Sequence, residues 1–364
     1  MLKLKPVQVA RALTHKLLRL TILPIEDCIL SCTYCYEDHV GENRAIYKLK
    51  QAISDNKRFR VAANDELTQL ELEYNVRNRS ATFKPMSRST INGIKNLLTT
   101  RKKKGLEVLY LSWFGGEPLM EIAIIKEIHE HANSLNLKVI ANATTNYVPV
   151  TSKVLAKLCA FGLNRFQVSL DGSQQDHDQT RISVSGKGTY KRIMSNLIQA
   201  RETDLDFNIG LRIHSHPGNY PRMPDFLREI SETFLHDKRF SVDLHAVGDY
   251  GGDAVKDMDI FNATEQAKMI EDIKQYVKYS YHKPILSEEE AEPYVCYACH
   301  PNFFVIRASG DIAKCTVSLK KIGTLAENGQ LDIDGEKHKF FLRGWNDFNP
   351  ANVNLKQLEC AYSK

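Results

Sequence analysis

Three of the eight cysteines of this 364-residue chain fall within eight consecutive positions, as Cys28, Cys32 and Cys35. Their C-x3-C-x2-C spacing allows one loop to surround a single metal centre, because thiolates bind both zinc and iron–sulfur clusters. A closed zinc site or a saturated [4Fe-4S] cube needs four protein ligands. The loop therefore leaves one corner of a cube open, unless His39 supplies a fourth ligand and completes a structural zinc site.

The other cysteines lie mostly near the end of the sequence. Cys159, in the apolar helical pattern VLAKLCAFGL, is predicted to be an ordinary core residue. The sequence contains no run of eighteen apolar residues and no signal-peptide pattern, so we expect a cytoplasmic protein. Because the cytosol keeps thiols reduced, clustered cysteines there indicate metal or redox chemistry rather than disulfides.

The overall composition is that of an ordinary globular protein, with 43% apolar and 26% charged residues. The net charge of +5 is modest. The basic run RKKK, residues 101–104, is predicted to end a helix, where cations interact well with the helix dipole. The composition therefore indicates neither a nucleic-acid-binding protein nor a membrane protein.

Short β-rich runs alternate with segments of helical period along most of the chain, which is typical of parallel βαβ units. The predicted strands cover residues 17–25, 107–115, 137–146, 164–172, 207–214 and 240–248. Two predicted helices have apolar faces, formed by Ile125, Ile128, Ala132 and Leu135 and by Tyr190, Ile193, Met194, Leu197 and Ile198. The predicted fold class is α/β, a partial (β/α)6 barrel of the TIM type, with its chemistry at the carboxyl ends of the strands.

The barrel is predicted to span residues 17–284, after an N-terminal extension of residues 1–16. Residues 41–83 are highly charged and are interpreted as an insertion. The segment NFFVIRASGDIAKCTVSL, residues 302–319, predicts a hairpin that turns at Ser309–Asp311. Residues 285–364 are thus predicted to form a small C-terminal domain that carries cysteines.

The segment CILSCTYCYE, at the end of the first predicted strand, resembles the C-x3-C-x-aromatic-C loop of radical S-adenosylmethionine (SAM) enzymes. In that family three thiolates hold a [4Fe-4S] cluster, and SAM chelates the fourth iron through its amino and carboxylate groups. One electron then yields a 5'-deoxyadenosyl radical, which abstracts a hydrogen from substrate. The resemblance implies that Cys28, Cys32 and Cys35 bind the cluster and that Tyr34 lies beside the cofactor.

The stretch WFGGEPLM, residues 113–120, resembles the family's GGE motif, which binds the amino group of SAM. The resemblance implies that role for Gly115, Gly116 and Glu117. Taken alone, the stretch is equally consistent with a strand-to-helix turn, with Pro118 at the helix start.

The stretch FQVSLDGSQQDHDQTR, residues 166–181, resembles the SLDG...HD..R segment of the peptide- and protein-modifying branch of the family. It implies that Ser169 approaches the SAM ribose or carboxylate and that Arg181 pairs with a carboxylate. A polar turn with an exposed surface arginine is the alternative. The tripeptide TTN, residues 144–146, matches the usual TNG only in part, because Tyr147 replaces the glycine, and it is assigned no contact.

The spacing from Cys299 through Gly310 to Cys315 resembles the opening of the SPASM and twitch extensions, which carry auxiliary iron–sulfur clusters. The resemblance implies one auxiliary [4Fe-4S] cluster, with Cys296 and Cys360 completing four thiolates. A treble-clef or ribbon zinc site fits the same spacing. The full SPASM pattern continues with a further cysteine-rich run, so either one auxiliary cluster binds or Cys360 begins a run that has been lost.

Family members with such a pair of domains mostly modify a residue within a peptide or protein. The resemblance therefore implies a maturase of a ribosomally synthesised peptide that forms a carbon–carbon or thioether crosslink, with electrons from a flavodoxin or ferredoxin. Sulfatase maturases are thought to use an aspartate directly after the cysteine of the G-x4-C element as a base, and Thr316 stands there instead. A sulfatase-maturating-type enzyme, a small-molecule dehydrogenase and a non-enzymatic zinc-binding interaction module remain alternatives, and no catalytic base is assigned.

Overall fold

The structure is a computed structural model that describes residues 9, 12–36, 84–250, 254–279, 295–317, 320–348 and 352–359. The predicted insertion at 41–83 lies outside the described residues, as do His39 and Cys360. Among the described helices, none is long and apolar enough to cross a membrane.

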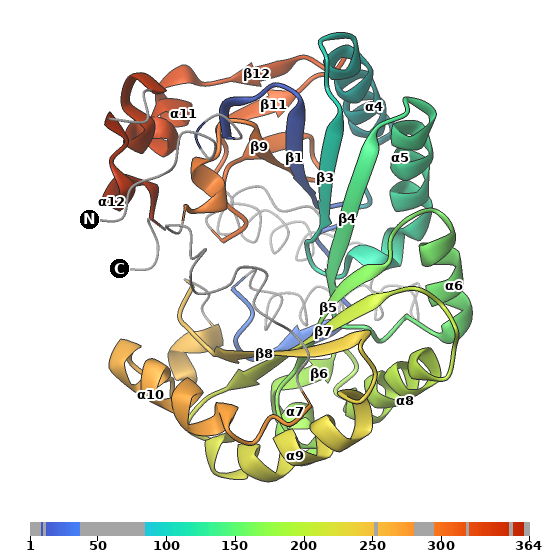
Figure 1. Ribbon diagram of the computed structural model, residues 1–364, viewed down its shortest axis with the longest axis vertical. Coiled ribbons are helices and arrows are strands. Elements are labelled where there is room, and N and C mark those ends of the chain that lie inside the picture. Colours follow the sequence, from blue (N-terminus) through green and yellow to red (C-terminus); the bar gives the residue numbers. More distant parts are fainter. Residues whose placement is uncertain are drawn as a thin grey trace, which may run out of the picture.

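Six parallel strands form the partial barrel that the sequence predicts (Figure 1). In spatial order they are β1 (Leu17–Ile22), β3 (Val108–Trp113), β4 (Lys138–Thr145), β5 (Arg165–Leu170), β7 (Asn208–Ser215) and β8 (Phe240–Ala246). Every pair of neighbours in this series runs parallel. The carboxyl ends of these strands therefore meet at one end of the barrel, and the predicted α/β fold class is confirmed.

Helices cover the outside of the sheet (Figure 1). They are α4 (Arg88–Lys103), α5 (Ile122–Ser134), α6 (Ser152–Ala160), α7 (Gln174–Thr180), α8 (Tyr190–Arg201), α9 (Met223–Phe234) and α10 (Ala263–Lys274). The basic run at 101–104 ends α4, as predicted, with its cations in the last turn.

The predicted apolar faces of α5 and α8 are largely buried, although Leu135, the C-cap residue of α5, is half-buried. Ile198 of α8 is 38% exposed, so its predicted burial is wrong. The buried Ile193, Met194 and Leu197 already fill the face of α8 that packs on the core, and Ile198 lies at its edge. Cys159 is half-buried and packs against the main core, consistent with its predicted structural role.

The C-terminal segment extends the same sheet. Strand β9 (Phe303–Ile306) pairs in parallel with β1, and β10 (Asp311–Ala313) returns antiparallel to β9, which confirms the predicted hairpin. The short strands β11 (Gly323–Leu325) and β12 (Leu331–Ile333) follow, and the helices α11 (Gly335–Leu342) and α12 (Leu355–Leu358) complete this region. Gly310 occupies the turn with φ of +86°, a conformation that favours glycine.

A buried ion pair joins this segment to the loop that follows β1. Arg307, between β9 and β10, donates two hydrogen bonds to the carboxylate of Glu26, and both side chains are 1% exposed. Breaking such a pair is costly, because the remaining partner becomes an uncompensated buried charge. The hairpin and the start of the cysteine loop are therefore held together.

A second buried polar contact supports the end of β3. Nε1 of Trp113 donates to Nε2 of His129 in α5 at 3.1 Å, and Nδ1 of His129 lies 3.2 Å from the carbonyl oxygen of Phe161. These partners require a neutral imidazole with its proton on Nδ1. Burial accordingly lowers the pKa of His129 to about 4.

His129 should make the protein less stable in acid. Because the unfolded histidine takes up a proton that the folded one does not bind, its contribution is full above pH 6.5 and is lost as the pH falls towards 4, by up to about 3 kcal/mol. We expect His129→Gln to flatten this part of the curve of unfolding free energy against pH, measured by urea unfolding. The exposed His236→Gln should leave the curve unchanged, and identical curves for wild type and His129→Gln would contradict the assignment.

Candidate active site

A cavity of about 570 Å³ lies at the carboxyl ends of the barrel strands. This is the end where barrels of this type place their chemistry. All predicted ligands of the first cluster line it, as do all predicted cofactor-binding residues except Glu117. The residues that the sequence singles out in separate motifs are therefore brought together around one space.

The cysteine loop enters this cavity between β1 and a small second sheet. Strand β2 (Leu30–Cys32) pairs antiparallel with β6 (Arg181–Ser183), and this register sets Cys32 opposite Arg181. The backbone N–H of Thr33 also donates to the carbonyl of Thr180 at 2.9 Å. These bonds fix the loop to the segment after β5, so the predicted cluster ligands and the predicted carboxylate partner share one local scaffold.

The glycine pair after β3 lets the cysteine loop approach the barrel. A β-carbon on Gly115 would lie 2.4 Å from the carbonyl oxygen of Ile25, and one on Gly116 would lie 2.0 Å from that of Asp27. Gly115 also has φ of +118°, which side chains rarely tolerate. No larger residue fits at either position without displacing the loop.

Glu117 is buried beneath this contact and does not line the cavity. Its carboxylate accepts hydrogen bonds from the hydroxyl of Thr145 at 2.8 Å and from the backbone N–H groups of Leu119 at 3.1 Å and Asn146 at 2.7 Å. Glu117 is the N-cap of a short 3-10 helix, Pro118–Glu121, which begins with Pro118 as the alternative interpretation expected. Burial raises the pKa of Glu117 to about 7, although these hydrogen bonds act to lower it. Direct contact with an ammonium group stays a prediction.

The TTN tripeptide, to which the sequence assigned no contact, also lines the cavity. Nδ2 of Asn146 lies 3.7 Å from the sulfur of Cys28. Tyr147 adopts φ of +62°, so it keeps the left-handed backbone for which glycine is usual. The partial match to TNG was therefore a usable signal, because the backbone can make the same turn with a tyrosine.

A buried hydrogen-bond network orders the wall behind Cys32. The hydroxyl of Tyr34 donates to Oδ1 of Asp171 at 2.8 Å and accepts from Nη1 of Arg181 at 2.9 Å. Asp171 also accepts from Thr180 Oγ1 at 2.6 Å and pairs with Nδ1 of His214 at 3.3 Å. Burial acts to raise the pKa of Asp171, but the His214 contact and the charge of Arg181 outweigh it and hold the pKa well below its usual range.

Arg181 is only 7% exposed, which excludes the alternative of a surface arginine. Its Nε is buried and has no hydrogen-bond partner among the described residues. An unsatisfied buried donor of this kind is costly unless a ligand accepts from it. The arrangement fits an anionic group in the cavity beside the cysteine loop.

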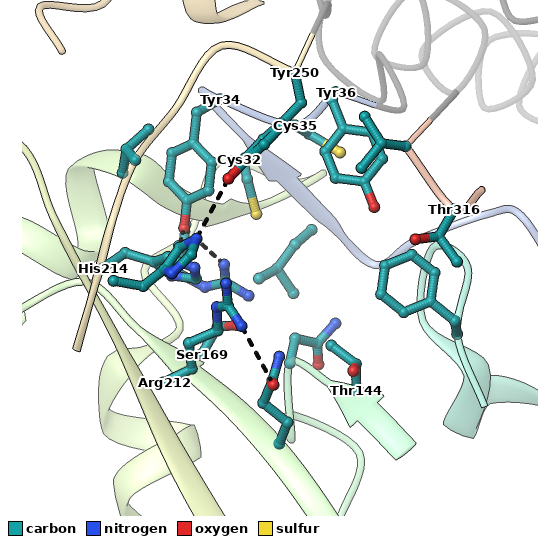
Figure 2. A pocket seen from close by; sticks show the side chains of 18 of the residues that line it. Cys32, Tyr34, Cys35, Tyr36, Thr144, Ser169, Arg212, His214, Tyr250 and Thr316 are labelled. Atoms are coloured by element: carbon teal, nitrogen blue, oxygen red, sulfur yellow. Dashed lines mark hydrogen bonds between the residues drawn. The ribbon is translucent and has the colours of Figure 1, made fainter. Parts of the chain in front are cut away.

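The adjoining wall, formed by β7 and β8, contains polar residues that the sequence did not single out. Arg212 and His214 of β7 and His245 of β8 line the cavity, and Figure 2 shows the first two across the space from Thr316. Along β7 these polar side chains alternate with the fully buried Ile213 and its apolar neighbours. That period-2 pattern in GLRIH was the available signal, since it turns one face of the strand into the barrel.

The C-terminal segment completes the cavity with Tyr297, Thr316 and Val317. The hydroxyl groups of Tyr297 and Thr316 lie 2.7 Å apart. The hydroxyl of Tyr297 also lies 3.8 Å from the sulfur of Cys315. One tyrosine therefore contacts both the cavity wall and a predicted auxiliary-cluster ligand.

The described cysteines of the C-terminal segment are all buried, as Cys296, Cys299 and Cys315. The backbone N–H of Cys296 donates to the carbonyl of Leu358 at 2.8 Å. Lys314 is fully buried nearby, where burial lowers its pKa to about 7 while the charges of Cys299 and Cys296 oppose this. These residues provide three buried thiols and one buried amine. Cys360 lies outside the described residues.

The spacing of the cysteines bears on the zinc alternatives. Within the described part of the chain, no three His, Cys, Asp or Glu side chains lie close enough together to ligate one metal ion. A zinc ion holds all its thiolates about 2.3 Å from one point, whereas a cube binds each thiolate to a separate iron. The three cysteines that line the cavity stay the predicted ligands of the [4Fe-4S] cluster.

Comparisons with known proteins agree with these motifs. The profile of the radical SAM superfamily matches residues 22–230. The AdoMet-dependent heme synthase of Methanosarcina barkeri (strain Fusaro / DSM 804) is 28% identical over 159 residues, which are 43% of this chain and 41% of that relative. The chain thus aligns with about two fifths of the length of this curated relative.

Two solved structures share the fold at low identity. The structure of anSMEcpe with bound AdoMet and Kp18Cys peptide is 13% identical, with a TM-score of 0.60 over 95% of this chain and 92% of that chain. The structure of Streptococcus suis SuiB bound to precursor peptide SuiA is 14% identical, with a TM-score of 0.58 over 97% of this chain and 73% of that chain. Both support the mixed α/β architecture with a parallel sheet.

The contact between Gly116 and Asp27 can be tested by adding one methyl group. We expect Gly116→Ala to displace the cysteine loop and lower bound iron severalfold after anaerobic reconstitution, because its β-carbon would overlap the Asp27 carbonyl. Gly335→Ala is the control, since no atom lies within 4 Å of its β-carbon. Full iron loading of Gly116→Ala would show that the loop does not depend on this contact.

Proposed function

Because this chain belongs to the radical SAM superfamily, we propose that it modifies a residue of a peptide, as a maturase that forms a carbon–carbon or thioether crosslink in a ribosomally synthesised peptide. When bound, the [4Fe-4S] cluster and SAM supply a 5'-deoxyadenosyl radical that abstracts a hydrogen from the substrate. The chain's own residues hold these groups, orient them and exclude water. The observation that carries the proposal is the single cavity that unites the three cysteines with the buried, unsatisfied Nε of Arg181.

Each wall of the cavity has a part in this proposal. Cys28, Cys32 and Cys35 hold the cluster, and the backbone of Gly115 and Gly116 lies close enough to contact SAM. Glu117, which holds Thr145 and Asn146, is proposed to face the SAM ammonium group or to position the residues that do.

The network around Tyr34 supports a cofactor carboxylate near Arg181. Tyr34, itself bonded to Asp171, holds Nη1 of Arg181, and Nε is left without a partner among the described residues. Ser169 lines the same part of the cavity. Charge-assisted hydrogen bonds of this kind are strong, and they set the orientation of the cofactor as well as its affinity.

A peptide substrate is favoured by the two solved structures described above, both of which were determined with a peptide bound. The cavity extends from the cysteine loop to Thr316 and Val317, so its far end is available to a substrate side chain. Among the described residues that line it, none is Asp or Glu. A sulfatase-type base is therefore not supplied there, and Thr316 does not replace it at neutral pH.

We also propose that Cys296, Cys299 and Cys315, together with Cys360, hold one auxiliary [4Fe-4S] cluster. The burial of the described three in one segment supports a protected cofactor site at this position. Tyr297 separates this position from the cavity. The electron donor is proposed to be a flavodoxin or ferredoxin.

Metal content and SAM cleavage test the proposal together. Reconstituted wild type should bind about eight irons with sulfide, four per cube, and should form 5'-deoxyadenosine from SAM under reducing conditions. The variant with alanine at Cys28, Cys32 and Cys35 should bind about half as much iron and form none of this product. Zinc in place of iron, or equal product from both proteins, would contradict the proposed function.

The role of Arg181 can be tested with a substitution that keeps its charge. Arg181→Lys removes the planar fork that serves both Tyr34 and a carboxylate. We expect SAM to bind about tenfold to a hundredfold more weakly, because one or two charge-assisted hydrogen bonds are lost. Anaerobic equilibrium dialysis measures this, and cluster absorbance checks that iron loading is unchanged. Arg165→Lys, at the exposed start of β5, serves as control, and an equal SAM affinity in the two variants would remove Arg181 from the cofactor site.

A further inference from the structure

In the proposal above, no residue of the wall formed by β7 and β8 contacts the cofactor, although His214 supports Asp171 behind Arg181. Arg212, His214 and His245 line this wall, and Figure 2 shows the side chain of Arg212 directed into the space. The side chain of Arg212 is 25% exposed, so it is largely withdrawn from bulk solvent while still reachable from the cavity. An arginine in this position is available to a molecule that enters beside the cofactor.

The protein holds Arg212 only weakly. Its Nη1 lies 3.4 Å from Oε1 of Gln167 and 3.4 Å from Oδ2 of Asp243. Both distances are at the long end of the range for such contacts, and the Asp243 side chain is 56% exposed, so this ion pair contributes little. Both contacts also use the same nitrogen of a group that has five N–H donors. The guanidinium therefore keeps donors for a ligand.

The charge of the cavity favours an anion at this wall. Two arginines line the cavity, and no Asp or Glu does so among the described residues. Arg181 is balanced by the buried Asp171, whereas the described acidic partner of Arg212 is the exposed Asp243. Burial, with help from the charge of Arg212, lowers the pKa of His245 to about 4, so this imidazole is a neutral hydrogen-bonding group at neutral pH.

We infer that Arg212 binds an anionic group of the substrate, a carboxylate or a phosphate ester, with the imidazoles of His214 and His245 beside it. The inference rests on the proposed function, because it places the cofactor carboxylate at Arg181 and leaves Arg212 to the substrate. A guanidinium recognises either anion through two parallel hydrogen bonds. An anionic group held here fixes the position of the neighbouring C–H bonds of the substrate in the cavity. It thereby selects which hydrogen atom is abstracted from the substrate.

Small anions can serve as probes, since the substrate itself is unidentified. The probes are glutarate, its neutral diamide glutaramide, and inorganic phosphate. Each is titrated calorimetrically and anaerobically into the full, reconstituted chain, with and without saturating SAM. A probe that binds only at Arg181 is displaced by SAM, whereas a probe bound at Arg212 remains.

Three variants connect the binding to Arg212. We expect glutarate or phosphate to bind in the presence of SAM, and Arg212→Gln to weaken this binding at least about tenfold. Arg212→Lys should lie between Arg212→Gln and wild type, because a point charge replaces the planar fork. Arg165→Gln removes one positive charge from the exposed start of β5, at the other end of the barrel, and should have no effect. Circular dichroism checks that each variant is folded.

Several results would overturn the inference. They are the absence of anion binding by wild type in the millimolar range, equal binding by wild type and Arg212→Gln, and binding of glutaramide as strong as that of glutarate. Weaker SAM binding by Arg212→Gln would assign this residue to the cofactor instead. The tighter of the two anions identifies the substrate group as a carboxylate or a phosphate ester.

The proposed function is measured on the same preparations, as formation of 5'-deoxyadenosine. If wild type forms this product and anion binding does not depend on Arg212, the inference alone fails. If wild type forms no product while anion binding depends on Arg212, the anion site stands and the proposed function fails.

Discussion

The candidate site depends on one close contact between two backbone segments, the loop that follows β1 and the glycine pair that follows β3. The carbonyl oxygen of Asp27 occupies the space of a β-carbon at residue 116 and accepts a hydrogen bond from the N–H of Glu117 at 2.9 Å. This contact sets the height of the cysteine loop above the barrel. It also helps to set the distance between the sulfur of Cys28 and Nδ2 of Asn146, because the backbone N–H of Asn146 donates to the carboxylate of Glu117.

A second level of order comes from Asp171, whose buried carboxylate connects four elements. From the end of β5 it contacts Tyr34 of the cysteine loop, Thr180 at the end of α7 and His214 of β7. Through Tyr34 it also positions Arg181. A buried carboxylate with this many partners is stable only when all of them are present. The cofactor wall and the proposed substrate wall are thus coupled through one side chain.

The sequence predicts the strands and the cysteine loop well, because a six-strand barrel repeats one local pattern and the loop ligands are contiguous. It does not predict where Glu117 finds its partners, since Thr145 and Asn146 belong to another strand and meet it only in the folded barrel. Arg212 is a similar case, because its importance comes from the cavity it faces and from the absence of described acidic neighbours there. Local periodicity contains no information on such contacts between strands.

The pairing of β9 with β1 means that the first and last parts of the described chain fold as one unit. The N–H groups of Arg19 and Leu23 donate to the carbonyls of Asn302 and Ile306, each at 2.9 Å. A chain cut before residue 295 would expose these donors along an apolar strand edge and deprive Glu26 of its guanidinium partner. Such a truncated barrel would be prone to aggregate, because the C-terminal segment covers the edge of β1 that would otherwise be left unpaired.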